Sequence, residues 1–540
     1  MASSPPDPSN DPSPDASAAP GGVFARFLAG VEWLGNLLPH PVTLFVVFDV
    51  LVLLLSGLAG GLGWSVQDPR PGGGTIEAVS LLNPEGLRRI AQGVVTNFTG
   101  FAPLGTVLVA LLGVGIAESS GLLGAGIRAL VLGAPRNLLT AAVVLAAVIS
   151  NTASEMGYVV LIPLAAAVFH SVGRHPLAGL AAAFAGVSGG YSANLFIGTV
   201  DPLLAGITTE SAALIDESYA RGGPNEILAT ANWYFMAIST ALITVVGTWV
   251  TTRIVEPKLG AFAADRAEPE VLEGARSMGA LSSEERRGLR ITAGILLALG
   301  GLLAWMAIPA DGWFRDPEAG ESTLAQLRPL LKSVVALVFV FFGLGGIVYG
   351  RVTGSMRGEQ AIIGAMSKAM GSMGLYMVLV FFAAQFVAWF KWTNLGMILA
   401  VEGADLLREL ALTGPTIFVP FILMCCFVNL MLGSASAQWA VTAPIFVPML
   451  MTVGYSPQVI QAAYRIGDST TNTITPMMSY FGLILAFAMR YDRKLGIGTL
   501  VATMLPYSIA FLVGWMVLFY VWVFGLGLPV GPGTPLHYAP

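Results

Sequence analysis

Two aspartates stand in long apolar stretches of the chain, each beside a run of hydroxyl and amide side chains. Asp201 follows the segment 189–194 (GGYSAN), and Asp468 opens the segment 468–476 (DSTTNTITP). A charged group inside a membrane-spanning segment is costly and usually functional. Hydroxyl and freed carbonyl oxygens can coordinate Na⁺, whereas a buried carboxyl group can carry a proton. Both aspartates are therefore predicted to bind and release a coupling ion, either H⁺ or Na⁺.

Each aspartate also has a structural interpretation that the sequence leaves open. Asp201 could cap a helix at the outer membrane interface, because acidic side chains suit helix N-termini. Asp468 could form an ion pair with Arg465, three residues earlier on the same helix face. That pair could equally be the coupling device, since protonating the acid would free Arg465 for an anionic substrate.

Two short polar segments interrupt other apolar stretches. The segment 150–155 (SNTASE) contains Glu155, which is either a second proton site or a side chain that reaches to the membrane interface. The segment 433–439 (GSASAQW) contains Ser436 and Trp439, and the indole could stack on an aromatic ligand. Its alternative, a tryptophan of the interfacial belt, fits less well because this segment should lie at mid-depth.

Amide and hydroxyl side chains recur at all of these polar segments. The candidates for an ion or substrate site are Asn151, Thr152, Asn194, Asn472 and Thr473. The three asparagines could bind Na⁺, but no cluster of His, Cys and carboxylates with metal-ligand spacing occurs in the sequence. We expect no cofactor, and H⁺ or Na⁺ as the coupling ion.

The composition places these residues in a membrane protein. Of 540 residues, 55% are hydrophobic and only 11% are charged, and the mean hydropathy is +0.74. Soluble domains carry roughly 25% charged residues. The net charge of −5 and the absence of a basic cluster argue against nucleic acid as a partner. The lipid bilayer is the expected partner, and the adjacent Cys425 and Cys426 are expected to be core side chains.

The hydropathy predicts an all-α polytopic fold. Nine stretches are apolar enough to span a bilayer, which needs about 20 residues. They are residues 41–64, 97–118, 177–201, 233–252, 291–309, 330–350, 369–390, 461–489 and 495–526. Two more, about 137–172 and 416–453, contain the polar segments at their centres. Each is either a re-entrant hairpin or two full spans with a polar loop, because irregular backbone survives at membrane depth only where protein or water shelters it.

Loop charges predict the orientation. Basic residues gather in the loops near 128–136, 170–175, 253–290, 351–368 and 490–494, which are therefore expected to be cytoplasmic. Residues 1–30 are predicted to be a disordered cytoplasmic tail. The two membrane halves are 31–252 and 291–532, joined by the cytoplasmic loop 253–290, and 533–540 form an external tail. The expected location is a bacterial inner membrane.

The two halves resemble each other weakly. In each, a polar segment is followed by a span broken by Asn, Thr, Asp and Pro, and the loop charges make the two segments enter from opposite faces. This is the pattern of an inverted repeat with its binding site at the bilayer midplane. It indicates a secondary transporter.

Four stretches together resemble the p-aminobenzoyl-glutamate transporter (AbgT) family, with similarity from about residue 31 to 532. They are 97–105 (NFTGFAPLG), 173–179 (GRHPLAG), 440–449 (AVTAPIFVPM) and 464–469 (YRIGDS). The resemblance implies a homodimer of nine spans and two hairpins that transports p-aminobenzoyl-glutamate. In some members it implies proton-driven export of sulfonamides, which are p-aminobenzoate analogues.

The family residues that match this chain are Asp201, Ser436, Trp439, Pro457, Arg465, Asp468 and Pro476. On this reading Arg465 binds carboxylate, Trp439 stacks on the ring, and Asp201 or Asp468 couples the ion. The tip 150–152 (SNT) departs from some relatives, which leaves the ion site open. Asp49 departs from an apolar first span, and the sequence assigns it no role.

Other functions can be weighed against this one from the sequence. Within transport, a Na⁺-coupled dicarboxylate importer fits the same pattern. An ion channel would need filter rings or a gating-charge helix, and neither is present in the sequence. An intramembrane enzyme would need a nucleophile–base pair, and a nucleotide-driven pump would need a phosphate-binding loop. We expect neither catalysis nor nucleotide binding in this chain.

Overall fold

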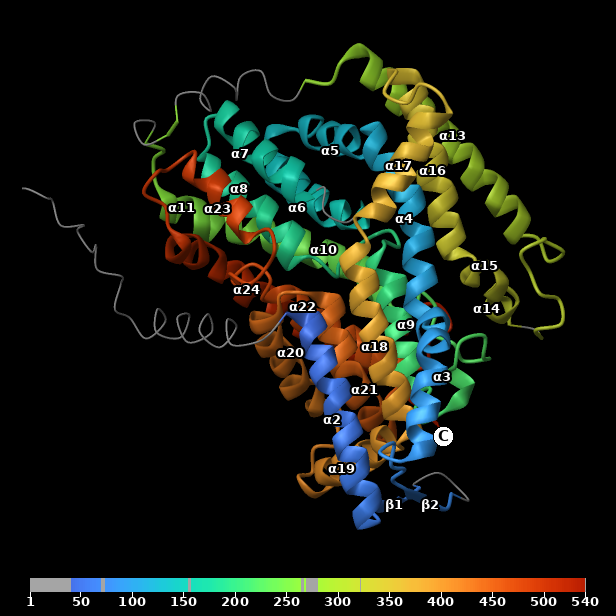
Figure 1. The fold of residues 1–540 in the computed structure, drawn as a ribbon. Helices are drawn as coiled ribbons and strands as arrows, with labels where there is room; N and C mark the ends of the chain where they lie inside the picture. The colour runs from blue at the N-terminus through green and yellow to red at the C-terminus, as the bar shows by residue number, and fades with distance from the viewer. Residues whose placement is uncertain are drawn as a thin grey trace, which may run out of the picture.

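A computed structural model describes residues 40–68, 73–153, 157–263, 267–268, 280–320 and 322–539. Glu155 and the predicted tail 1–30 lie outside these residues. Within them the chain is almost wholly helical (Figure 1). The two short strands described, β1 (Ser65–Gln67) and β2 (Thr75–Glu77), pair antiparallel with Val66 opposite Ile76.

The first half runs from α2 to α11. Its helices are α2 (Pro41–Leu62), α3 (Pro84–Gly100), α4 (Ala102–Ser120), α5 (Leu122–Leu132), α6 (Leu139–Ser150), α7 (Ile162–Ser171), α8 (Pro176–Phe184), α9 (Val200–Ala212), α10 (Trp233–Val250) and α11 (Glu256–Leu259). Short 3-10 or π turns flank them, namely η1 (Arg136–Leu138), η2 (Asn151–Ala153), η3 (Gly157–Leu161), η4 (Ala185–Gly189), η5 (Glu217–Tyr219) and η6 (Thr251–Val255).

The second half runs from α13 to the C-terminus. Its helices are α13 (Ser283–Ala307), α14 (Thr323–Gln326), α15 (Arg328–Lys332), α16 (Val334–Thr353), α17 (Glu359–Gly371), α18 (Gly374–Trp392), α19 (Leu395–Glu409), α20 (Phe418–Leu432), α21 (Ala435–Val453), α22 (Pro457–Thr470), α23 (Phe481–Met489) and α24 (Ile497–Phe519). The short turns are η8 (Pro415–Ile417) and η9 (Tyr520–Gly525).

The two interrupted stretches are re-entrant hairpins. The arm α6 has 12 residues, about 18 Å at 1.5 Å per residue, which is too short for a hydrocarbon core of about 30 Å. The arms α20 and α21 turn at Gly433 and Ser434, and Gly433 lies directly against the backbone of Met477 in another part of the chain. In Figure 1, α6 and α7 lie in the upper part of the molecule and α20 and α21 in the lower part. We call the α6–α7 pair hairpin 1 and the α20–α21 pair hairpin 2.

Two spans are broken where the sequence predicts it. The first runs through α8 and η4, loses helical structure at 190–199 and resumes as α9. The second runs through α22, breaks at 471–480 and resumes as α23. Gly190 lies at the first break, and Pro476 lacks the N–H that a continuous helix would need at the second.

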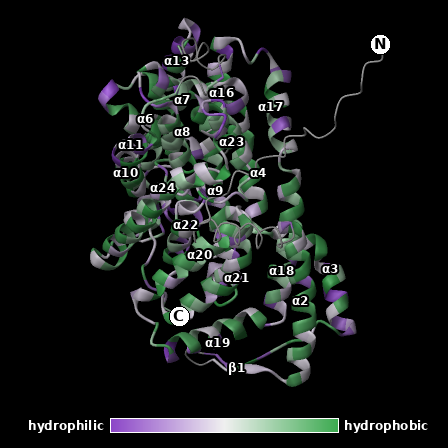
Figure 2. Ribbon diagram, turned by 90° about the vertical axis from the view of Figure 1, so that its left-hand side faces the viewer, coloured by the Kyte–Doolittle hydropathy of each residue, from purple (hydrophilic) through white to green (hydrophobic). Residues whose placement is uncertain are grey.

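The fold is an all-α membrane fold with nine spans and two hairpins. Among the described residues, nine helical segments are long and apolar enough to cross a bilayer, and two of them are the arms of hairpin 2. The other seven, with the two broken spans, give the predicted nine. In Figure 2 hydrophilic residues gather at the two ends of the molecule and along α22 in its interior.

The ends of the molecule differ in the way that the loop charges predict. The α5–α6 and α7–α8 connections, α11 and the start of α13 lie at one end in Figure 1, together with the loop before α24. The two strands, α19 and the C-terminus lie at the other end. We refer to these as the basic end and the C-terminal end.

The sequence missed several helices. The stretch predicted as 97–118 belongs to a helical segment of 37 residues, Pro84–Ser120, about 55 Å long and therefore longer than a bilayer is thick. The helices α5, α17 and α19 were also not predicted. The helix α5 is apolar but has only 11 residues, whereas α17 and α19 are less apolar than the spans.

Candidate functional site

The two broken spans meet in the interior. The backbone N–H of Ser192, in the first break, donates to the Ser469 hydroxyl at 3.1 Å. The Asn472 amide, in the second break, donates to the Ser188 carbonyl at 3.4 Å. The backbone that each break frees is thus partly satisfied by the other half of the molecule, which is why irregular backbone is stable at this depth.

The helix α22 carries the charged residues of the site. All 14 of its residues are buried. It starts sharply, because the Ser456 hydroxyl accepts from the Val459 N–H and Pro457 occupies the first turn, where its missing N–H costs nothing. This fixed start places Arg465 and Asp468 two to three turns inside the protein.

Arg465 pairs with Asp201 from the other half. Its Nη2 lies 2.7 Å from Asp201 Oδ1, and the side chains are only 3% and 4% exposed. The Asp201 Oδ2 accepts from the Gly198 N–H at 2.7 Å, and Arg465 Nε donates to Asn232 Oδ1 at 3.0 Å. The interpretation of Asp201 as an interfacial cap is therefore wrong, and so is an Arg465–Asp468 ion pair, because the guanidinium turns to Asp201 instead.

A chain of hydrogen bonds extends this pair to Trp439. The Gln461 amide donates to Asn232 at 2.7 Å, Gln461 accepts from Thr208 at 2.5 Å, and the Trp439 indole donates to Thr208 at 2.9 Å. The Trp439 ring is fully buried and stacks on Tyr464 at 4.2 Å between centroids. In this state Trp439 therefore packs within the protein rather than against a cavity.

Asp468 is fully buried, and neither of its carboxylate oxygens has a hydrogen-bond partner among the described residues. Arg465 lies near enough to act on it electrostatically, and the neighbouring Tyr464 hydroxyl donates to the Ala435 carbonyl at 2.6 Å instead. An ionised carboxylate that is buried without a partner is strongly disfavoured. This group is therefore free to accept a proton or to ligate a cation.

Asn429, on α20, organises the second break. Its amide nitrogen donates to the Asp468 carbonyl at 2.7 Å, to Thr471 Oγ1 at 2.9 Å and to Asn472 Oδ1 at 2.8 Å. Its own Oδ1 has no hydrogen-bond partner among the described residues. The same is true of Thr473 Oγ1, although that side chain is fully buried.

The tip of hairpin 1 packs on the first break. The Thr152 hydroxyl donates to Asn194 Oδ1 at 3.0 Å, and the Asn151 amide donates to the Gly190 carbonyl at 3.4 Å. The Asn151 Oδ1 is buried and unpaired among the described residues. Asn151 and Asn194 therefore belong to one cluster, whereas Asn472 belongs to the cluster around Asn429. The structure does not bring the three asparagines into one hydrogen-bonded group.

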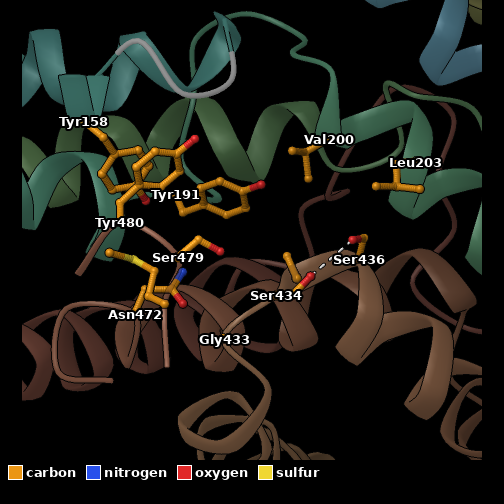
Figure 3. A pocket seen from close by; sticks show the side chains of 12 residues that line it. Tyr158, Tyr191, Val200, Leu203, Gly433, Ser434, Ser436, Asn472, Ser479 and Tyr480 are labelled. Carbon is orange, nitrogen blue, oxygen red and sulfur yellow. Dashed lines mark hydrogen bonds between the residues drawn. The ribbon is translucent and has the colours of Figure 1, made fainter. Parts of the chain in front are cut away.

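A cavity of about 190 Å³ lies between the tip of hairpin 2 and the two breaks. Figure 3 shows the rings of Tyr158, Tyr191 and Tyr480 on one side of it and the hairpin tip, with Ser434 and Ser436, below. The Tyr158 and Tyr480 rings stack with centroids 4.6 Å apart and planes 6° apart. The cavity thus offers an aromatic wall and hydroxyl groups to a ligand.

A second cavity, of about 490 Å³, lies on the other side of the hairpin 2 tip. It is lined by the start of α2, by Tyr376 and neighbouring residues of α18, and by Met431 and Leu432. Both cavities share Gly433, Ser434, Ser436 and Ser479. The tip of hairpin 2 therefore separates a smaller polar chamber from a larger apolar one.

The predicted site residues separate into three groups. Ser436 and Asn472 line the smaller cavity. Asp201, Arg465, Asp468 and Trp439 lie in the buried network behind it, and Asn151, Thr152 and Asn194 form the hairpin 1 cluster. Pro457 starts α22, and Pro476 lies in the second break. Asp49 is elsewhere, buried on α2 with its Oδ1 unpaired among the described residues.

Sequence reasoning missed the tyrosines of the cavity and the polar partners Asn232, Asn429 and Gln461. A signal was available for Asn429, since it is the only amide in the apolar run 418–432. Tyr158, Tyr191 and Tyr480 gave no such signal, because aromatic residues are common throughout membrane helices.

Crossed broken helices, two opposed hairpins and a buried charged network define the class of protein as a secondary membrane transporter. Residues 26–538 match the AbgT transporter family model, and the chain belongs to this family. It is 36% identical over 503 residues to the p-aminobenzoyl-glutamate transport protein of Escherichia coli K12, covering 93% of this chain and 95% of that protein.

Two solved structures share the fold. MtrF of Neisseria gonorrhoeae, described within a class of antimetabolite efflux pumps, is 57% identical with a TM-score of 0.87, covering 94% of this chain and 100% of that one. The YdaH transporter of Alcanivorax borkumensis, described as having an unusual topology, is 46% identical with a TM-score of 0.84, covering 92% and 100%. The fold and the family predicted from the sequence are thereby confirmed.

Proposed function

We propose that this protein transports p-aminobenzoyl-glutamate and related aromatic anions, and exports sulfonamides, with transport coupled to protons. The observation that carries the proposal is the unpartnered carboxylate of Asp468 beside the Asp201–Arg465 pair, where the two breaks cross. The E. coli relative is named for p-aminobenzoyl-glutamate and MtrF is described with antimetabolite pumps, which supports the choice of substrates.

Different parts of the site bind the aromatic ring and the carboxylate of the substrate. The aromatic ring lies against the tyrosines of the smaller cavity, where Tyr158 and Tyr480 already stack. Ser434 and Ser436 donate to the amide or sulfonyl oxygens. A substrate carboxylate replaces Asp201 as the partner of Arg465, because a guanidinium can donate to either carboxylate.

Proton coupling follows from competition for Arg465. When Asp201 and Asp468 are both ionised, Asp201 is bonded to the guanidinium, and the three groups together carry one net negative charge that repels an anion. Protonation of one aspartate leaves Arg465 available to the substrate. Loss of that proton on the other side of the membrane displaces the anion, since an arginine with two carboxylate neighbours no longer attracts it.

Na⁺ is the second candidate for the coupling ion. Unpaired oxygens of Asn429, Thr473 and Asp468 occur together near the second break, and oxygen ligands of this kind suit hard cations. Exchange measured with choline in place of Na⁺ at fixed pH separates the two ions. Proton coupling predicts unchanged flux, and Na⁺ coupling predicts its loss.

The test of function is counterflow of labelled p-aminobenzoyl-glutamate in proteoliposomes under imposed pH gradients. The wild type should accumulate substrate against its gradient, and D468N should exchange substrate without responding to pH. Asp405→Asn is the matched control, because Asp405 is exposed and pairs only with Arg408 on α19. A D468N protein that still responds to pH like the wild type would contradict the proposed role of Asp468.

We also propose a homodimer in a bacterial inner membrane, with the basic end in the cytoplasm. The loop charges support this orientation. The helix α13 supports an assembly, because little of it is buried within the described chain. Lipid can cover the same surface, so a mass measurement of the protein in native nanodiscs tests the dimer.

A further inference from the structure

A third cavity lies at the C-terminal end of the molecule, beyond the start of α22. Its volume is about 70 Å³, enough for about two waters at 30 Å³ each or for one carboxylate group. Its walls are mostly polar. They are formed by the loop 219–231, by Arg328 of α15, by Gln458 of α22 and by residues 532–535.

Two buried polar atoms of this cavity have no hydrogen-bond partner among the described residues. They are Nη2 of Arg328 and Oε1 of Gln458, and the Gln458 side chain is 7% exposed. A buried donor that is left unsatisfied destabilises the protein, and a charged donor does so more strongly than a neutral one. The cavity therefore suits an occupant that accepts a hydrogen bond from a guanidinium.

Arg315 has a purely structural role and can be compared with Arg328. Its Nε and Nη2 donate to the Ala307 and Ile308 carbonyls, and its Nη1 donates to Gln326. All three nitrogens of Arg315 are occupied, and they close the end of α13. Arg328 lies only 13 residues later, but its Nη2 has no such partner among the residues that the structure describes.

The cavity is connected to the main site by direct contacts. The Gln458 carbonyl accepts from the Asn232 amide at 2.8 Å, and Asn232 Oδ1 accepts from Arg465 Nε at 3.0 Å. Along α22, Gln458 precedes Arg465 by seven residues, about 10 Å of helix. A carboxylate that leaves Arg465 toward the C-terminal end therefore meets the Arg328 cavity about 10 Å further along α22.

Charged groups of both signs surround the cavity. Arg221 and Lys332 line the adjoining cavity with Glu226, and Glu226 also lines the cavity of Arg328. Glu226 is already engaged, because it lies 3.8 Å from Lys332 and accepts from the Gly222 N–H. Glu210 also interacts with Arg221 and Glu226, and Asp216 interacts with Tyr219 in the cavity wall. The acids therefore offset Arg221 and Lys332, and the attraction for an anion comes from the unpartnered Nη2 of Arg328.

We propose that the cavity under Arg328 is a carboxylate-binding subsite on the C-terminal side of the Arg465 site, occupied by the substrate as it passes. This subsite rests on the proposed transport of aromatic carboxylates. Arg328 takes the carboxylate, and Gln458 accepts from a donor group such as the substrate amide or a water. Arg465 of α22 and Arg328 of α15 then bind the substrate carboxylate one after the other.

The first test compares the two sides of the membrane. In right-side-out and inside-out vesicles, R328Q should raise the KM for p-aminobenzoyl-glutamate about tenfold from the C-terminal side and less than twofold from the basic side. R328K should be intermediate. Arg88→Gln is the control, because Arg88 is an exposed arginine at the same end of the molecule. A KM that is unchanged on both sides, or raised equally on both, would overturn the subsite.

The second test does not depend on transport. Thr534 also lines the cavity, so p-aminobenzoyl-glutamate should protect T534C from a small thiol reagent in the purified protein. R328Q should abolish this protection, and p-aminobenzamide, which has no carboxylate, should give none. Absence of protection with Arg328 in place means that water alone fills the cavity. Protection in a protein that fails to exchange the substrate would contradict the proposed function and retain the subsite.

Discussion

At the scale of single residues, the Asp201–Arg465 pair and Asp468 should respond differently to neutralisation. Asp201→Asn leaves a buried guanidinium without its counter-charge, and breaking one side of a buried ion pair costs about 3–5 kcal/mol. Asp468→Asn removes a carboxylate that has no hydrogen-bond partner, so it should cost little. We expect a clearly lower thermal midpoint for D201N than for D468N, measured by fluorescence unfolding in detergent.

The double variant D201N/R465Q tests whether the lost stability comes from the unpaired arginine. Because it removes both charges, it should recover part of the stability that D201N loses. Equal midpoints for D201N and D468N would show that Asp201 is not the principal partner of Arg465.

The stacked tyrosines provide a prediction about substrate. Tyr480→Ala removes one ring of the stack, and an aromatic pair contributes about 0.5–1.5 kcal/mol beyond its buried area. We expect the KM for p-aminobenzoyl-glutamate to rise about 3- to 10-fold, with a smaller change for Tyr480→Phe. If Trp439→Phe weakens substrate binding more than Tyr480→Ala does, the ring contacts Trp439 in the bound state and the cavity assignment is wrong.

The sequence identified the charged residues of the site but not their contacts. Asp201, Arg465 and Asp468 stand out because charge inside apolar stretches is rare. Their pairing could not be predicted, since the Asp201 and Arg465 bond joins residues 264 positions apart, and local spacing favoured Asp468 instead. The role of Asn429 depends on three partners around one break, and only the packed structure brings these together.

At the scale of elements, the tip of hairpin 2 depends on Gly433. Its φ of +55° lies in the left-handed region, and an added Cβ would lie 2.9 Å from the Met477 carbonyl oxygen. The left-handed conformation alone costs a residue with a Cβ roughly 1–2 kcal/mol. Gly433→Ala should therefore lower the thermal midpoint and slow exchange, because the tip separates the two cavities.

Gly482→Ala is the matched control for this prediction. Gly482 lies in α23, and an added Cβ would meet nothing within 4 Å. Alanine is also the better helix former, so this variant should be neutral or slightly stabilising. Normal stability and exchange in G433A would show that the tip adopts another conformation during transport.

Elements were predictable where hydropathy or a polar interruption marked them. Both hairpins and both breaks were located from their Ser, Asn and Thr runs. The helices α17 and α19 were not, because their stability comes from packing an amphipathic face on other helices. The helix α3, which precedes α4 directly, was missed for the same reason. Its mean hydropathy is close to that of a helix in a soluble protein.

At the scale of the whole molecule, the inverted repeat requires the two ends to lie on opposite sides of the membrane. Both native cysteines, Cys425 and Cys426, are buried, so single cysteines introduced at exposed positions can be labelled selectively. Ser283, at the start of α13, and Thr75, in β2, are exposed at the basic and C-terminal ends. In intact cells, a membrane-impermeant thiol reagent should label T75C but not S283C, and inside-out vesicles should reverse the result. Labelling of both from one side would place the ends in the same compartment. Two hairpins entering from opposite faces, and with them the shared site at the crossing of the breaks, would then be incompatible with the membrane.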